Sequence, residues 1–155
     1  MEKRGRLVLN FASKIVKQLK SYSKKIEIVG SIRRKSENPH DVDIVLIPKD
    51  IEKIKAFMSK KGKNIEAGKE RTFWRVDGID LDLFYTNEEE WGAALLAFSG
   101  KKGSNIGLRV IAKNKGFKLT QHGLFNRKTG KRVAGKTEHE IYSALNRPYK
   151  EPWDR

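Results

Sequence analysis

Two aspartates, Asp41 and Asp43, stand two positions apart at the start of a β-branched, apolar run that extends to Ile47. Side chains alternate between the faces of a strand, so both carboxylates should point to the same face. Like charges in an apolar setting are costly unless a cation neutralises them. The pair predicts a divalent-metal site. A turn cap plus an ordinary ion pair is the simpler interpretation of an isolated Asp-x-Asp.

A second pair of aspartates favours the metal interpretation. Asp80 and Asp82 are again two positions apart on an apolar β-run, later in the chain. One of them can face the first pair across a sheet. Three carboxylates can hold two Mg²⁺ ions about 4 Å apart, the arrangement used for in-line phosphoryl transfer.

Groups suited to binding phosphate precede the first aspartates. Gly30 and Ser31 form a turn signal, and Arg33, Arg34 and Lys35 follow. Backbone amides, a hydroxyl and cations are the groups that surround phosphates in proteins. A Gly-Ser turn and a run of basic residues are each common in proteins. Their position just before the aspartate strand is what predicts a triphosphate site.

The elements that position these groups follow from residue patterns. Before residue 86 we expect a helix at 6–19, strands at 26–29 and 41–47, a helix at 51–62 and a hairpin of strands 73–76 and 79–85. After it we expect helices at 87–100 and 104–115, short strands at 117–119, 124–125 and 132–133, and a helix opened by Thr137. The patterns predict an α+β fold. Near Thr86 the sequence changes from strand-rich to helix-led, which suggests a boundary between two subdomains.

Composition narrows the class of protein further. The chain has 155 residues, with 34 Lys and Arg against 19 acidic residues and a net charge of +15. Such a surface attracts polyanions and predicts nucleic-acid binding, with a merely solubilising surface as the alternative. The absence of cysteine excludes disulfides and thiolate chemistry. No signal-peptide or membrane-spanning run is present, so a cytoplasmic or nucleoid location is expected.

Two sets of motifs resemble one family. Residues 30–34, Gly-Ser-Ile-Arg-Arg, followed by Asp-Val-Asp at 41–43, resemble the nucleotidyltransferase signature of the family X DNA polymerases, the relatives of polymerase beta. Similarity to the thumb of that family lies in Leu96-Ala97-Phe98-Ser99-Gly100, Asn105, Arg109, Lys115-Gly116-Phe117 and Tyr149-Lys150-Glu151-Pro152. The resemblance covers essentially the whole chain. It implies a palm at 1–86, with a mixed sheet and helices on one face, a small α/β thumb at 87–155, and no lyase or fingers domain.

The resemblance also implies roles for individual residues. Asp41 and Asp43 would bind both metal ions, and Asp82 would complete the primer-side site, with Asp80 as the competing candidate. The ions would be two Mg²⁺, with Mn²⁺ as an alternative. The implied nucleotide-binding residues are Gly30, Ser31, Arg34, Phe98, Gly100 and Asn105, and the implied DNA-binding residues are Lys101, Lys102 and Arg109. Ala97 and Ser99 depart from the tyrosine and threonine that are usual in the family, which leaves discrimination against ribonucleotides open.

The implied activity is DNA-directed addition of deoxynucleotides to a primer 3′-end, in short-gap repair, by a monomer. Alternatives are template-independent extension, transfer of a nucleotide to a protein, an RNA end or a small molecule, and a non-catalytic nucleic-acid-binding module. Of the tryptophans, Trp91 is expected in a core, whereas Trp74 could stack on bases or lie in a core.

Overall fold

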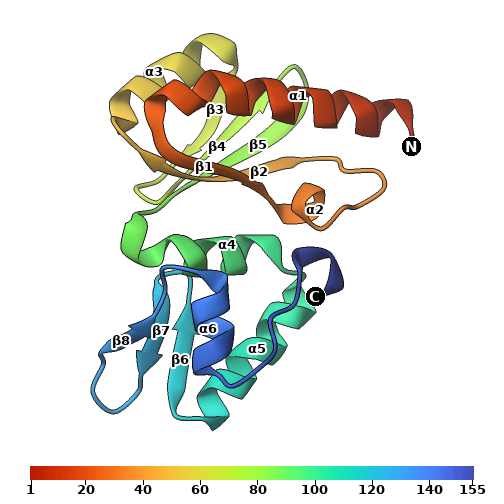
Figure 1. Ribbon diagram of the computed structural model, residues 1–155. Coiled ribbons are helices and arrows are strands. Elements are labelled where there is room, and N and C mark those ends of the chain that lie inside the picture. The colour runs from red at the N-terminus through yellow and green to blue at the C-terminus, as the bar shows by residue number, and fades with distance from the viewer. The chain divides into compact units, whose positions relative to one another are not determined.

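The computed structural model describes residues 1–155 without a gap. The chain forms two compact units, Met1–Thr86 and Asn87–Arg155. Both mix helices with strands (Figure 1). The expected α+β class is confirmed, with a mixed sheet in the first unit and a small α/β arrangement in the second. No helix is both long and apolar enough to span a membrane.

The first unit is built on a five-stranded sheet. Its elements are α1 (Lys3–Leu19), a 3₁₀ turn (Lys20–Tyr22), β1 (Ser23–Val29), α2 (Gly30–Arg33), β2 (Val42–Pro48), α3 (Ile51–Lys61), β3 (Lys63–Ala67), β4 (Arg71–Val76) and β5 (Ile79–Tyr85). The strand order is β1-β2-β5-β4-β3. Strands β2 and β5 pair in parallel, and the other neighbours are antiparallel. The central parallel pair therefore brings together segments far apart in the sequence.

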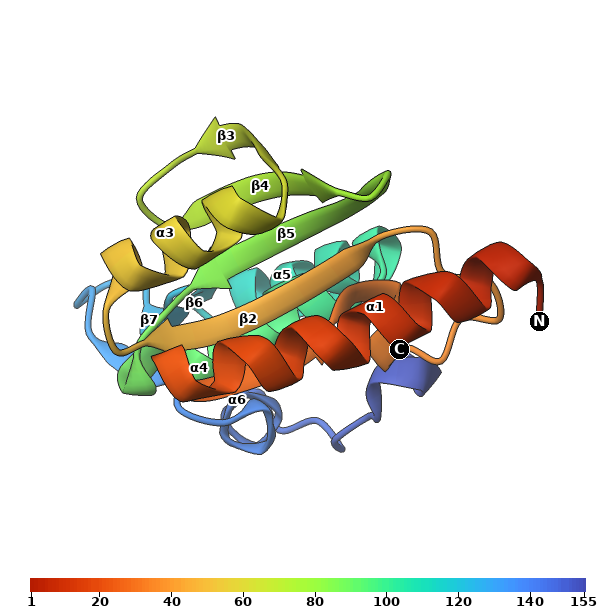
Figure 2. The same ribbon diagram turned by 90° about the horizontal axis from the view of Figure 1, so that it is seen from above.

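Helices α1 and α3 cover one face of this sheet (Figures 1 and 2). Apolar residues recur every three or four positions along α1, so Val8, Ala12 and Ile15 form one buried stripe. They pack in a core with alternate strand residues, which are Val42, Ile44, Leu46, Leu81 and Leu83. The residues between these on β2 and β5 point to the opposite face. Asp43 and Asp82 belong to that second set.

The β4–β5 hairpin fixes the register at one side of the sheet. Asp77 and Gly78 have φ angles of 51° and 76°, as a tight turn with two left-handed residues requires. Trp74 on β4 is only 2% exposed, and its Nε1 donates to Thr72 Oγ1 at 2.9 Å. Trp74 is therefore a core residue and offers no surface for stacking on bases.

The second unit consists of a helical layer and a three-stranded antiparallel sheet. Its elements are a 3₁₀ turn (Glu88–Glu90), α4 (Trp91–Ser99), α5 (Lys102–Asn114), β6 (Phe117–Thr120), β7 (Gly123–Asn126), β8 (Arg132–Ala134), α6 (Glu138–Ala144) and a 3₁₀ turn (Pro152–Asp154). The strand order is β6-β7-β8. Thr137 caps α6, because its Oγ1 accepts from Glu140 N at 3.0 Å.

A buried ion pair ties the end of this unit to α6. Arg155 Nη1 lies 2.7 Å from Glu138 Oε2, and the two side chains are 1% and 5% exposed. The guanidinium also lies over the rings of Tyr142 and Tyr149, at 5.7 and 5.5 Å from the ring centroids. Residues 138–155 are thereby joined to the core that α4, α5 and the small sheet share.

Candidate active site

Asp43 and Asp82 are neighbours in the parallel β2–β5 ladder, where their Cα atoms are register partners. Adjacent strands are about 4.8 Å apart, so carboxylates on one face at this register lie within reach of one cation. Asp80 lies on the same face two residues earlier. Its Oδ1 accepts from Arg75 Nε at 2.7 Å, an ion pair directly across the β4–β5 hairpin.

Asp41 lies in the bend that precedes β2 rather than within the strand. The strand begins at Val42, so the expected start at residue 41 was one residue early. Asp41 nevertheless acts on the pair, because its charge raises the pKa of both Asp43 and Asp82. The structure thus brings three carboxylates into one electrostatic group.

The pKa of Asp43 is raised from 3.8 to about 6. Burial is the largest cause, followed by the charges of Asp82 and Asp41, while the charge of Arg34 opposes them. The pKa of Asp82 is also raised, chiefly by burial, although its contacts with Arg71 act in the other direction. Side-chain hydrogen bonding between the two acids raises the pKa of Asp43 further and lowers the pKa of Asp82. Ionisation of both neighbouring acids costs free energy, and a bound cation would offset that cost. The pair is therefore suited to binding a cation.

The turn that carries Gly30 lies directly against Asp43. Gly30 has a φ of 62°, and a β-carbon at this position would overlap the Asp43 carboxylate. Only glycine combines the left-handed backbone with the missing side chain. Ser31 lies in α2, and Arg34 follows the end of that helix. The expected phosphate-binding residues therefore adjoin the carboxylates within the first unit.

Arg71 is a part of this site that the sequence patterns did not indicate. Its Nε and Nη2 lie 2.6 and 2.5 Å from Asp82 Oδ1. With the side chains in these positions, no three carboxylate or histidine groups form a ready metal-binding cluster. The donor set still fits a divalent cation, because carboxylate oxygens are its preferred ligands and Asp41, Asp43 and Asp82 repel one another in the absence of positive charge.

The remaining expected nucleotide-binding residues lie in the second unit, at the corner between α4 and α5. Phe98 is in the last turn of α4 and Gly100 follows its end. Asn105 Nδ2 donates to the Ala97 carbonyl at 2.9 Å, so this amide joins the two helices. Lys101 and Lys102 are exposed at the start of α5.

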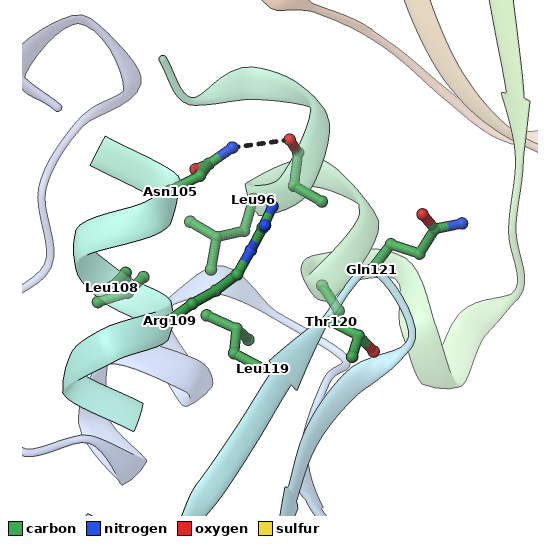
Figure 3. A pocket seen from close by; sticks show the side chains of 9 residues that line it. Leu96, Asn105, Leu108, Arg109, Leu119, Thr120 and Gln121 are labelled. Carbon is green, nitrogen blue, oxygen red and sulfur yellow. Dashed lines mark hydrogen bonds between the residues drawn. The ribbon is translucent and has the colours of Figure 1, made fainter. Parts of the chain in front are cut away.

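A small pocket opens beside this corner (Figure 3). Asn105 and Arg109, one helical turn apart on α5, both line it together with Ala97. The other lining residues are Ala93, Leu96, Leu108, Leu119, Thr120 and Gln121. The pocket lining combines the apolar side chains of Leu96, Leu108 and Leu119 with polar side chains, among them Asn105 and Arg109.

Sequence comparison relates the chain to known proteins. A sequence model described as the DNA polymerase beta thumb matches residues 94–155. A protein named repair DNA polymerase X, from African swine fever virus, is 31% identical over 162 residues, which cover 98% of this chain and 91% of the viral protein. DNA polymerase IV of Saccharomyces cerevisiae is 40% identical over 75 residues, covering 48% of this chain and 12% of the yeast protein. DNA nucleotidylexotransferase of Xenopus laevis is 32% identical over 87 residues, covering 56% of this chain and 17% of the frog protein. The chain therefore belongs to the family X DNA polymerases.

Proposed function

We propose that this protein is a DNA-directed DNA polymerase that adds deoxynucleotides to a primer 3′-end during the filling of short gaps. The observation that carries the proposal is the register of Asp43 with Asp82 in the β2–β5 ladder. That register gathers carboxylates on one face of the sheet, beside the Gly30 turn. The full-length likeness to a viral repair polymerase supports the choice of DNA as substrate.

In the proposed reaction the primer 3′-oxygen attacks the α-phosphorus of the incoming nucleotide, and pyrophosphate leaves. Asp41, Asp43 and Asp82 would hold two divalent ions, Mg²⁺ or Mn²⁺. When bound, such ions neutralise phosphate charge and activate the attacking hydroxyl. Asp82 would act on the primer side and assist removal of the hydroxyl proton. Asp80 is a weaker candidate for that role, because Arg75 already pairs with it.

We assign palm and thumb roles to residues 1–86 and 87–155. In the palm, Gly30, Ser31 and Arg34 would bind the β- and γ-phosphates. In the thumb, the nucleotide would contact Phe98, Gly100 and Asn105, and DNA would contact Lys101, Lys102 and Arg109. Asn105 would reach the base edge by exchanging its present bond to the Ala97 carbonyl.

The net charge of +15 supports DNA as the partner. Phosphate contacts by Lys and Arg release counterions, so affinity falls steeply as salt rises. DNA binding and primer extension should therefore weaken as the salt concentration rises.

Template-independent extension is the second candidate. The specific observation in its favour is the similarity to a protein named DNA nucleotidylexotransferase. Both activities would use the same carboxylates, and they differ only in whether a template base selects the nucleotide.

The test is extension of a labelled primer on single-nucleotide-gapped, recessed and single-stranded DNA, with each deoxy- or ribonucleotide and with Mg²⁺ or Mn²⁺. Template-matched addition on gapped DNA would support the proposal, and addition without a template would favour the second candidate. Asp43→Ala should abolish addition yet leave DNA binding nearly unchanged. Equal activity in Asp43→Ala, or no addition by the wild type under any condition, would overturn the proposal.

A further inference from the structure

Arg71 is held in place by neighbours other than its acidic partner in the site. Its Nη1 lies 3.2 Å from Glu66 Oε2 on β3. The guanidinium carbon lies 5.5 Å from the ring centroid of Phe73 and 5.9 Å from that of Phe84. Strand pairing sets Phe84 opposite Arg71, and Phe73 opposite Asp82. Side chains of β3, β4 and β5 therefore fix where the guanidinium lies.

The contact with Asp82 is directed at one oxygen. Both Nε and Nη2 of Arg71 reach Oδ1, at 2.6 and 2.5 Å. The Asp82 side chain is 18% exposed, so the carboxylate is partly covered yet open to a ligand. When one oxygen of a carboxylate is held by a hydrogen bond, its second oxygen points in a fixed direction. Hydrogen-bond partners of metal ligands orient those ligands in this way.

We propose that Arg71 is a positioning residue for the third carboxylate of the active site. It holds Oδ1 of Asp82 and leaves Oδ2 for the primer-side metal ion, and it keeps this contact while the ion is bound. The inference rests on the proposed function, because it gives Asp82 a metal to bind. Glu66, Phe73 and Phe84 in turn hold the Arg71 side chain in place.

The chain supplies a matched control on the same strand. Arg75 lies four residues after Arg71 on β4, faces the same side of the sheet, and pairs with Asp80 at 2.7 Å. Arg71→Gln and Arg75→Gln each remove one positive charge and one arginine–aspartate pair from this face. They differ in whether the partner is the proposed metal ligand.

The first measurement is binding of Mn²⁺ alone to the full chain, followed by electron paramagnetic resonance. Loss of a group that orients a metal ligand typically weakens affinity about 10-fold or more. We expect that loss for Arg71→Gln and a change of less than about twofold for Arg75→Gln. Arg71→Lys should recover part of the affinity, because an ammonium can donate to Oδ1 but cannot fork onto it.

The second measurement is the Mg²⁺ concentration that gives half-maximal primer extension, compared with the KM for the nucleotide. Arg71→Gln should raise the Mg²⁺ midpoint and leave the nucleotide KM nearly unchanged. Glu66→Gln removes one of the contacts that hold Arg71 but leaves its contact with Asp82. It should therefore raise the Mg²⁺ midpoint less than Arg71→Gln does.

The outcomes separate this inference from the function on which it rests. An active wild type whose Arg71→Gln variant binds Mn²⁺ as well as, or better than, the wild type would overturn the role of Arg71 alone. So would an equal loss in Arg75→Gln. A wild type that neither binds Mn²⁺ nor extends a primer would overturn the proposed function, and this inference with it.

Discussion

Gly30 and Asp43 pack so closely that a single added carbon on the glycine would overlap the aspartate carboxylate. The turn and the strand that it precedes are thus in direct contact at the candidate site. The φ of 62° at Gly30 adds a second reason why a larger residue is excluded there.

Gly30→Ala should reduce primer extension by at least about 100-fold, because displacement of a carboxylate by as little as 1 Å can cost that much. Gly78→Ala is the matched control. Gly78 has a similar φ of 76°, yet a β-carbon there meets nothing within 4 Å. Both variants should lose about 1 kcal/mol from left-handed strain, measured by urea unfolding, but only Gly30→Ala should lose activity. Equal activities would show that the contact with Asp43 is unimportant.

The raised pKa of Asp43 predicts how stability depends on pH in metal-free protein. Between the unfolded value of 3.8 and the folded value of about 6, the native state binds more protons than the unfolded state. The free energy of unfolding should therefore be highest below pH 4 on this account, and should fall as pH rises through about 6. A shift of about two pKa units corresponds to a loss on the order of 3 kcal/mol.

Asp43→Asn should remove this dependence, because the amide never ionises. At pH 7.5 without metal, the variant should be more stable than the wild type by that amount, and at pH 4 the two should agree. Denaturant unfolding at both pH values is the measurement. A wild type as stable as Asp43→Asn at pH 7.5 would contradict the assignment of a raised pKa.

The identity of the third carboxylate can be tested by a pair of substitutions. Asp82→Asn should lower extension by at least about 100-fold, since it removes a proposed metal ligand beside Asp43. Asp80→Asn should lower it less than about fivefold, because that carboxylate is paired with Arg75. Single-turnover extension on gapped DNA at saturating Mg²⁺ is the measurement. The reverse ranking would assign the role to Asp80.

The stability of the second unit should depend on the buried ion pair between Arg155 and Glu138. Arg155→Ala leaves Glu138 buried without its cation, and breaking such a pair costs about 3 kcal/mol or more. Chemical denaturation should show this loss. Lys136→Ala is the control, because its contact with Glu89 is exposed and 3.7 Å long, and its effect should be small. Similar losses in both variants would show that the buried pair contributes nothing special.

Much of the fold could be predicted from local patterns. The turn signal at Asp77 and Gly78, between the expected strands 73–76 and 79–85, predicted the β4–β5 hairpin, which the structure shows with β4 starting two residues earlier. Strand β3 was not predicted. All five of its residues are exposed, so no apolar alternation marks it, and it is held by pairing with β4 at the sheet edge. The sequence did not decide whether Trp74 stacks on bases or lies in a core, because the burial of a tryptophan depends on tertiary packing.

The candidate site could be predicted in part. The spacing of the aspartates implied a common face within each strand, but not that Asp82, rather than Asp80, is the register partner of Asp43. That register depends on how β5 lies against β2, which is tertiary. Arg75 and Asp80 are equally far from the turn at Asp77 and Gly78, so the turn alone implies that they lie opposite each other. The diagonal reach of Arg71 to Asp82 depends on side-chain conformation, which no strand pattern contains.

The parallel pairing of β2 with β5 has a consequence for folding. The two strands are joined through α3, β3 and β4, and closing a connection of that length costs chain entropy before any contact repays it. Hairpins and helices can form earlier from local contacts. Repulsion between Asp43 and Asp82 thus arises only when β5 pairs with β2, so the electrostatic cost of the site accompanies the pairing with the largest sequence separation in this sheet.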